Sequence, residues 1–304
     1  MPALRRALPC PVCNTPADSA TLFLEENIDT SRLSGFSFAS RKEPEYMCHR
    51  LVSCSICELV YAVHPPGQDD LASAYHTAEY DSAEEASDAA DAYLEAIRPV
   101  LARLSHRQSA LEIGTGTGVF LDRLASAGFS ELVGVEPSAA AIAAAPADRR
   151  HWIREGIFRE QDFLPESFDL ICCFMTMEHV SGPSEIARSA FRLLRPGGVF
   201  VTVTHNYRSP VNRLLGKRSP IIDIEHLQLF SERSICELFV RSGYANIEVH
   251  DFSNRYSIRY WIRLLPIPSL AKRAILFVLS GLGASRLKLS FNVGNMIASG
   301  SKSE

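Results

Sequence analysis

Short apolar runs alternate with amphipathic stretches along the chain from residue 110 onward. The runs have the length expected of buried strands and fall at 110–113, 132–135, 169–174, 199–204 and 246–250. Between them, residues 119–125 and 232–240 show helical periodicity, and Ser231 is placed to cap the second helix. This alternation predicts the α/β class, as a Rossmann-like, doubly wound, mostly parallel sheet with helices on both faces.

The first apolar run ends in glycines at positions 114, 116 and 118, and a helical pattern follows at once. Glycines at such a strand–turn–helix junction let a ligand approach the backbone closely. The second run ends on Glu136, where an acidic side chain can accept hydrogen bonds from both hydroxyls of a ribose. We therefore expect a nucleoside site built from Gly114, Gly116, Gly118 and Glu136.

Glu112, on the strand before the glycines, narrows the choice of nucleoside. Dinucleotide folds favour the spacing G-x-G-x-x-G, whose amides face a pyrophosphate, whereas this chain has G-x-G-x-G. A carboxylate at Glu112 would repel a pyrophosphate and attract the ammonium group of an amino acid. S-adenosylmethionine carries a ribose, an adenine and an amino acid but no phosphate, so it fits these residues better than NAD does.

A series of motifs resembles, in the same order, those of class I S-adenosylmethionine-dependent methyltransferases. They lie at 112–118, 135–138, 167–171, 177–180 and 192–203. The segments 225–231 and 294–296 extend the resemblance to members that modify bacterial surface-glycan sugars, quinones or secondary metabolites.

The resemblance implies that Glu112, the three glycines, Glu136 and Met175 contact the cofactor. One position departs from the family pattern, because Ile157 stands about where an Asp often meets the adenine amino group. Adenine recognition would then use backbone groups or a neighbour such as Glu155 or Gln161.

The composition is that of a globular enzyme, with 46% hydrophobic and 22% charged residues among 304. A formal net charge of −4 argues against a nucleic-acid partner, because broad nucleic-acid binding needs a clustered basic face. No uninterrupted apolar stretch has the length of a membrane span, and Leu4–Leu8 is too short for the core of an export signal. These features predict a cytoplasmic protein.

Four of the eight cysteines form two C-x-x-C pairs, Cys10 with Cys13 and Cys54 with Cys57. Two such pairs can surround a tetrahedral Zn²⁺ ion with thiolates, so we expect a closed, structural zinc site. Redox thiols and unrelated core cysteines are the alternatives. The pairs also resemble a zinc-binding module that precedes some sugar and natural-product methyltransferases, which implies a structural role and a place over the acceptor site.

The remaining cysteines are expected to be structural. Cys172, Cys173 and Cys236 lie in apolar runs and are predicted core residues. Cys48 and His49 lie near the second C-x-x-C pair, where we expect a buried thiol and a surface imidazole in preference to metal ligands.

The chain divides into three predicted parts. They are a zinc-binding, zinc-ribbon-like module at 1–66, a connector with an N-terminal helix at 67–105, and a methyltransferase domain at 106–304 with a helical cap near 255–285. The connector is polar up to residue 85 and carries Tyr75 and Tyr80. Ser82–Glu85 offers a capping box for a helix that runs to about Leu104.

Methyl transfer to a hydroxyl needs an in-line approach and a group that removes a proton. The resemblance implies that the end of the fourth strand faces the methyl group, which makes His179 the candidate base, with Glu178 beside it. Adjacent residues do not face one point, so Glu178 would orient a loop or contact the cofactor. The alternatives are that His179 caps the helix that begins near Pro183, or that it only forms hydrogen bonds with the backbone.

His205 and Asn206 after the fifth strand, and His226 further on, are additional candidates for the acceptor pocket. Residues of this kind are more often structural hydrogen-bonders than catalysts. Glu178, His179 and His226 together could bind a divalent metal, as some quinone O-methyltransferases require, but the sequence shows no ligand spacing for it.

Residues 255–283 alternate basic with large apolar side chains. This pattern suits peripheral contact with an anionic lipid surface, as expected if the acceptor hung from a lipid carrier. We favour a helical cap on the sheet or a dimer interface, because apolar residues after Arg273 crowd every face of the predicted helix.

The function expected from these features is methyl transfer from S-adenosylmethionine to a hydroxyl of a small or carrier-linked acceptor. The acceptor class that we favour is a sugar in bacterial glycan or secondary-metabolite biosynthesis, and carbon methylation of a keto-sugar is a close variant. The alternatives are an RNA base methyltransferase with a zinc finger and a non-catalytic cofactor-binding scaffold.

Overall fold

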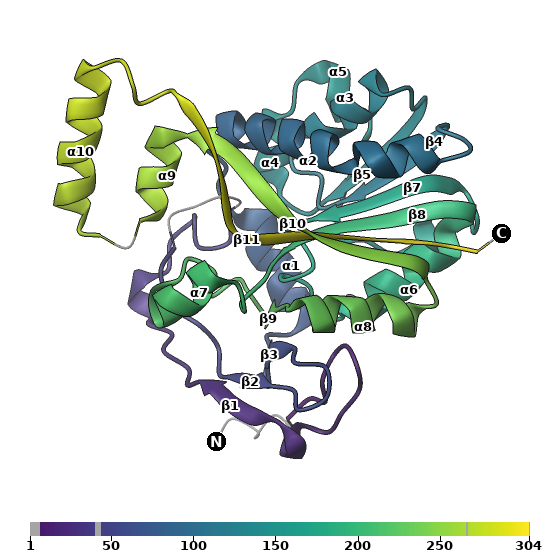
Figure 1. The fold of residues 1–304 in the computed structure, drawn as a ribbon, viewed down its shortest axis with the longest axis horizontal. Helices are drawn as coiled ribbons and strands as arrows, with labels where there is room; N and C mark the ends of the chain where they lie inside the picture. Colours follow the sequence, from purple (N-terminus) through teal and green to yellow (C-terminus); the bar gives the residue numbers. More distant parts are fainter. Residues whose placement is uncertain (1–6, 40–43, 266, 304) are drawn as a thin grey trace.

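A computed structural model describes residues 7–39, 44–265 and 267–303, which form two β-sheets and their surrounding helices (Figure 1). From one edge to the other, the larger sheet consists of β10 (Ala245–Ser257), β11 (Lys288–Ser301), β8 (Leu194–His205), β7 (Phe168–Phe174), β4 (Ser109–Ile113), β5 (Glu131–Glu136) and β6 (Ile153–Glu155). Neighbouring strands from β8 to β6 are parallel, and β11 is antiparallel to both of its neighbours. The predicted α/β class and mostly parallel sheet are confirmed.

Helices cover both faces of this sheet (Figure 1). The α-helices of the described residues are α1 (Gln68–Thr77), α2 (Ala83–Arg103), α3 (Val119–Ser126), α4 (Ala139–Ala144), α5 (Ala147–Arg150), α6 (Pro183–Leu193), α7 (Pro210–Leu215), α8 (Glu232–Ser242), α9 (Ile258–Leu264) and α10 (Ser269–Gly281). Short 3₁₀ turns lie at Ala17–Ser19, Thr30–Arg32, Glu160–Asp162 and Gly216–Arg218.

The two faces of the sheet have separate cores because side chains alternate along each strand. On β4, Ala110 packs into the core beneath α2 and α3, whereas Leu111 packs into the core beneath α6 and α8. Cys172 and Cys173 divide between these cores in the same way, as predicted for core residues. Both faces are therefore buried, as a doubly wound sheet requires.

A smaller antiparallel sheet joins the N-terminal part of the chain to the large one. Its strands, in spatial order, are β1 (Thr21–Leu24), β2 (Leu51–Ser53), β3 (Val60–Ala62) and β9 (Gln228–Leu229). β9 lies within the predicted methyltransferase domain, and Leu227 just before it accepts a 2.7 Å hydrogen bond from the amide of Ala62. A segment that follows His226 thus completes the N-terminal sheet.

Two local expectations around α1 and α2 need correction. Residues 68–77 form the helix α1 and are not merely a polar connector. Ser82 precedes α2 as predicted, but its side chain makes no capping hydrogen bond. The reason is its backbone, which has φ −106° and ψ 30° in place of the extended conformation of an N-cap. The predicted cap at Ser231 is confirmed, because its hydroxyl accepts from the amide of Ser234.

Residues 258–291, which we call the arm, comprise α9, α10 and the first part of β11. α10 extends away from the sheet, and none of its residues is buried (Figure 1). The helices predicted here are present, but α10 does not cover the sheet as a cap would. Across the described residues, no helix combines the length and apolar content that a membrane span needs.

Candidate active site

A cavity of about 640 Å³ lies where β4, β5 and β7 reach their carboxyl ends. The turn after β4, the acidic end of β5 and the segment after β7 border it, together with Tyr75 of α1 and the loop 205–226. Most of the predicted site residues line this cavity: Glu112, Gly114, Gly116, Glu136, Met175, His179, His205 and His226. Gly118 and Glu178 are not among the residues that line it.

The glycine turn leaves space beside the backbone at one position. Gly114, Gly116 and Gly118 have φ values of 80°, 56° and 69°, in the left-handed region that favours glycine. A Cβ atom at Gly114 would lie 2.3 Å from the hydroxyl of Thr176, so packing excludes a side chain there. A Cβ atom at Gly116 would meet no protein atom within 4 Å. The cavity beside Gly116 is therefore open to a ligand.

Two buried carboxylates flank this turn. Glu136 accepts hydrogen bonds from the amides of Gly116 at 2.7 Å and Ser138 at 2.9 Å. Burial raises the pKa of Glu136, while these two hydrogen bonds act in the opposite direction. Glu112 accepts a 2.5 Å hydrogen bond from the hydroxyl of Thr115. Each carboxylate oxygen can accept more than one hydrogen bond, so both groups fit the polar parts of a nucleoside linked to an amino acid.

The far side of the predicted cofactor site is largely backbone and apolar surface. Gly156, Ile157 and Phe158 line the cavity, whereas Glu155 and Gln161 are not among its lining residues. Of the options for adenine recognition, this arrangement favours backbone groups. Met175 also lines the cavity and has a φ of 49°, an uncommon value for a residue other than glycine.

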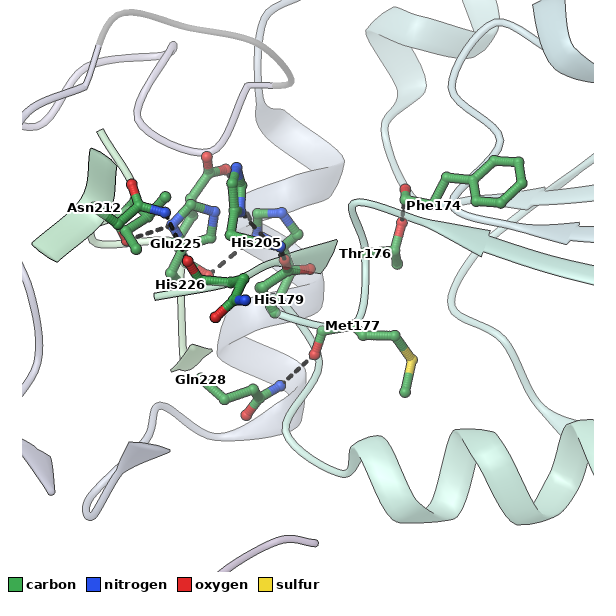
Figure 2. Close-up of polar contacts among 12 residues, drawn as sticks. Phe174, Thr176, Met177, His179, His205, Asn212, Glu225, His226 and Gln228 are labelled. Carbon is green, nitrogen blue, oxygen red and sulfur yellow. Dashed lines mark hydrogen bonds and ion pairs between the residues drawn. The ribbon is translucent and has the colours of Figure 1, made fainter. Parts of the chain in front are cut away.

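Three histidines gather on the opposite side of the cavity (Figure 2). The ring centroids of His179 and His226 are 4.9 Å apart, and those of His205 and His226 are 5.3 Å apart. His179 follows β7, His205 ends β8, and His226 precedes β9. Three segments that are distant in sequence thus bring imidazoles to one place.

His179 is held through its Nδ1 atom. This atom lies 3.0 Å from the hydroxyl of Tyr75, 3.2 Å from the carbonyl oxygen of Glu225 and 3.8 Å from Oε2 of the same glutamate. A carbonyl oxygen only accepts hydrogen bonds, so the tautomer that satisfies this contact carries its proton on Nδ1 and leaves a lone pair on Nε2. The N-cap of α6 is Gly182, so His179 does not cap that helix.

His226 has the same kind of support. Its Nδ1 atom lies 2.9 Å from the carbonyl oxygen of Ile221, which places the proton on Nδ1 and leaves Nε2 as an acceptor. The side chain of Asn206, in contrast, is hydrogen-bonded to the backbone, since its oxygen accepts from the amide of Arg208. Of these two candidates, His226 borders the cavity and Asn206 is not among its lining residues.

Glu178 lies behind the histidines. Its side chain is fully buried, and Oε1 accepts a 2.7 Å hydrogen bond from the amide of His205 and lies 3.2 Å from the imidazole Nδ1 of that residue. The carbonyl oxygen of Glu178 accepts from the amide of Leu227 at 2.8 Å. These contacts match the interpretation in which Glu178 orients a loop.

The structure groups the candidate metal ligands differently from the sequence. Ligand atoms of His179, Glu225 and His226 all lie within 4.8 Å of one another. The sequence predicted Glu178 as the carboxylate of this group, but the structure has Glu225 there. Glu178 is outside the group because its side chain turns toward His205. Carboxylate and imidazole are suitable ligands for several divalent metals.

The four paired cysteines meet as predicted. Cys10 and Cys57 have sulfur atoms 3.5 Å apart, those of Cys13 and Cys54 are 3.4 Å apart, and all four lie within 4.8 Å of one another. A tetrahedral Zn²⁺ ion with bonds of about 2.3 Å would place its sulfur ligands about 3.8 Å apart. Contact with Cys57 lowers the pKa of the Cys10 thiol to about 6, whereas the same contact raises the pKa of the Cys57 thiol. The donor set therefore fits a closed zinc site.

Cys48 stands apart from this cluster. Its Sγ atom contacts the carbonyl oxygen of Glu25 at 3.7 Å, and burial raises the pKa of its thiol to about 11. His49 differs from the prediction of a surface imidazole, since burial lowers the pKa of its ring and its Nε2 atom is buried.

Two residues of the histidine site were absent from the sequence-based candidates. Tyr75 was noted only as part of a polar connector, and Glu225 only as part of a family motif. The amphipathic stretch 68–77 was the signal for α1, which carries Tyr75 to the cavity. For Glu225, the signal in the sequence was its position next to His226.

Comparison with protein families gives one match along the central part of the chain. The model of the family described as a methyltransferase domain matches residues 85–249, more than half of the 304 residues.

Curated relatives include the ubiquinone biosynthesis O-methyltransferases of Pseudomonas fluorescens (strain SBW25) and Pseudomonas entomophila (strain L48). They are 28% and 27% identical to this chain over 117 residues. Each alignment covers 35% of this chain and 49% of the relative. The chain thus spans about half the length of the curated relatives it matches.

Similar solved structures include two S-adenosylmethionine-dependent methyltransferases. The protein from Archaeoglobus fulgidus is 14% identical, with a TM-score of 0.48, over 70% of this chain and 94% of its own. The protein from Mesorhizobium loti is 20% identical, with a TM-score of 0.43, over 69% of this chain and 97% of its own.

Proposed function

The chain belongs to the methyltransferase-domain family, and on that premise we propose that it transfers the methyl group of S-adenosylmethionine to a hydroxyl of a small or carrier-linked acceptor. One observation carries the proposal: the open turn at Gly116, the carboxylate of Glu136 and the imidazole of His179 line the same cavity. Bound S-adenosylmethionine supplies an electrophilic methyl group on a sulfonium. The residues of the chain then need to bind the acceptor, align its hydroxyl with the methyl group and remove the hydroxyl proton.

We assign the cofactor half of the cavity to the β4 and β5 ends. In this assignment Glu136 accepts hydrogen bonds from the ribose hydroxyls of S-adenosylmethionine and Glu112 faces its ammonium group. The open space beside Gly116 accommodates the part of the cofactor between these two groups. The amides that hold Glu136 in place, from Gly116 and Ser138, fix its carboxylate before the ligand arrives. Such preorganisation lowers the entropy cost of binding.

His179 is the proposed general base, accepting the proton of the acceptor hydroxyl at Nε2. The carboxylate of Glu225, 3.8 Å from Nδ1, stabilises the imidazolium that forms. Burial raises the pKa of Tyr75 well above its usual value, so Tyr75 stays a neutral phenol that fixes the ring. Glu178 acts as a positioning residue behind His205, and His205 and His226 contact the acceptor.

The character of the cavity supports a neutral acceptor. The described residues that line it include several tyrosines and Trp261 but no Lys or Arg. The curated relatives are named for O-methylation, which supports oxygen as the methylated atom. We therefore propose a hydroxyl-bearing ring, with a sugar as the leading class.

We also propose that Cys10, Cys13, Cys54 and Cys57 hold a structural Zn²⁺ ion. Their mutual distances and burial support this role, and the resulting site has four thiolates and no open position for a substrate.

Isotopically methyl-labelled S-adenosylmethionine and an extract of cells lacking this gene test the activity directly. The extract is separated into glycan, lipid, small-molecule and RNA fractions before purified protein is added. Label is expected in the glycan or small-molecule fraction, or in the lipid fraction if the acceptor is linked to a lipid carrier. Label in RNA would favour the nucleic-acid alternative, and absence of label with verified cofactor binding would favour the scaffold.

Two substitutions then separate binding from chemistry. His179→Ala is expected to lower turnover by about 10²–10⁴-fold and leave cofactor affinity nearly unchanged, because only proton removal is lost. Gly116→Val is expected to abolish cofactor binding, since its side chain would enter the open part of the turn. Unchanged turnover in the first variant, or full affinity in the second, contradicts the assignment of that residue.

A further inference from the structure

α10 turns its apolar face toward solvent. Leu270, Phe277, Val278 and Leu282 follow the i, i+7, i+8, i+12 spacing of one helix face. Their exposed fractions are 71%, 82%, 58% and 75%. A surface helix of a globular protein normally packs such a face onto the core. The described part of the chain leaves this apolar face of α10 uncovered.

The apolar face continues beyond the helix. Leu287, Leu289 and Phe291, at the start of β11, are exposed by 58%, 42% and 45%. In Figure 1 this strand segment lies at the same end of the molecule as α10, and α9 lies between the two in this view. Exposed apolar surfaces of this kind mark contacts with proteins or membranes.

The charge of the surrounding residues distinguishes a membrane partner from a protein partner. Residues 252–303 contain eight Lys or Arg residues and no Asp or Glu, although the whole chain has a net charge of −4. At the base of the arm, Arg259 and Lys288 contact Glu84 and Asp88 of α2. Arg273 on α10 and Arg286, which lies near Arg259 at the base of the arm, are both exposed. Apolar side chains flanked by cations, without any acidic residue, match an anionic lipid surface.

We propose that the arm, residues 258–291, binds the surface of an anionic lipid bilayer. Phe277 and its neighbours on α10 enter the boundary between headgroups and acyl chains, and the basic side chains contact the headgroups. No helix of the described chain spans the bilayer, so the attachment is peripheral. Two weak contributions, apolar burial and charge attraction, act together.

The base of the arm borders the cavity. Trp261, Leu264 and Leu265 belong to the arm and also line the cavity. Leu214 of α7, which is 88% exposed, lines the cavity too. A bilayer at the arm would therefore lie close to the acceptor side of the site. This consequence rests on the proposed methyl transfer: it makes the acceptor a lipid-anchored molecule taken from the membrane surface.

Cosedimentation of the full chain with vesicles tests the proposal without using activity, so a failure of methyl transfer does not affect the result. Vesicles of phosphatidylcholine alone are compared with vesicles containing phosphatidylglycerol. We expect at least a tenfold preference for the phosphatidylglycerol vesicles, weakened by high salt. Equal binding to both, or binding to neither, overturns the proposal.

Matched variants locate the contact. Phe277→Ser is expected to lower binding by about tenfold, whereas Leu164→Ser, at a residue 77% exposed outside the arm, leaves it unchanged. Arg273→Glu with Arg286→Glu is expected to remove the preference for phosphatidylglycerol. Equal effects of Phe277→Ser and Leu164→Ser contradict the assignment of the arm. A concentration-dependent dimer that Phe277→Ser disrupts, without vesicle binding, assigns the face to a second copy.

Discussion

Asp169 illustrates how a motif residue can serve the fold and not the chemistry. It belongs to a segment that resembles a family motif, yet it lies at the start of β7, away from the strand ends that border the cavity. Its carboxylate accepts from the amides of Gln108 and Ser109 and pairs with Arg195 at 2.9 Å. Burial alone would raise the pKa of Asp169, but these hydrogen bonds together lower it. The residue thus ties β4, β7 and β8 together.

Asp169→Asn should reveal this role in the free energy of unfolding. We expect a loss of about 2 kcal/mol at pH 7, because the charged partner and two amides lose their carboxylate. A carboxyl with a lowered folded pKa stabilises above its unfolded pKa and loses that contribution as pH falls. The difference from the wild type should therefore shrink below about pH 4.

Denaturant titrations across pH measure this difference, with Asp148→Asn, at an exposed residue of α5, as the control. The control is expected to change stability by less than about 0.5 kcal/mol. A difference for Asp169→Asn that is constant from pH 7 to pH 3 contradicts the argument.

At the same scale, the sequence located His179 and His226 by motif and chemistry, and both line the cavity. It could not locate Tyr75 as their neighbour, because the contact between α1 and the loop after β7 is purely tertiary. It also could not assign Glu225 over Glu178, since that choice depends on which way two side chains turn. The catalytic roles of these residues remain predictions.

Among the elements, β9 has an effect beyond its two residues. It pairs with β3 of the N-terminal sheet, and it follows directly on Glu225 and His226. Gln228 donates a 2.5 Å hydrogen bond to the carbonyl oxygen of Met177 (Figure 2) and another of 2.5 Å to that of Val180, on the other side of His179. The position of the histidine loops therefore depends on the sheet that the four cysteines support.

Removal of zinc should consequently also change the active site and lower turnover. We expect the purified wild type to contain one equivalent of zinc and Cys54→Ser to contain less, with a lower melting temperature and reduced turnover. The physical reason is that an unsupported N-terminal sheet no longer fixes β9.

Metal analysis, calorimetry and the labelled-methyl assay measure the three effects. Cys236→Ser is the matched control, since Cys236 lies in α8 outside the cysteine cluster. A zinc-free protein with unchanged melting temperature and turnover would show that the cysteines bind no structural metal.

The strands show what periodicity detects and what it misses. All five predicted apolar runs form strands of the large sheet. The runs in β4, β5, β7 and β8 are largely buried, whereas β10 is an edge strand and none of its residues at 246–250 is buried. β6 and β9 were not predicted because they are too short, at three and two residues respectively, to show a periodic pattern. β11 escaped because only its second half is buried, so that its first half reads as an exposed segment.

At the scale of the whole molecule, the cavity and the arm differ in the sign of their charged side chains. Glu79, Glu112, Glu136, Asp223 and Glu225 line the cavity, without a Lys or Arg among its described lining residues. The basic side chains after residue 252 lie mostly on the arm. A ligand in the cavity therefore experiences a negative field, which favours neutral or cationic groups and opposes phosphates.

Displacement of S-adenosylhomocysteine by nucleosides tests this field without knowledge of the acceptor. Adenosine is expected to compete at a concentration at least about tenfold lower than 5′-AMP, a difference of about 1.4 kcal/mol. High salt should narrow the gap. Equal or tighter binding of 5′-AMP, or of NAD, would contradict the cofactor assignment.

The pairing of β3 with β9 also has a consequence for synthesis on the ribosome. Val60 meets Leu229, and 169 positions separate the two partners along the chain. At about 5–20 residues per second, translation needs roughly 8–34 s to cover that distance. During this interval β3 lacks its neighbour, and an unpaired strand edge is a site where other chains can add. In the nascent protein this edge is therefore open to aggregation from the time that β3 has emerged until residue 229 has.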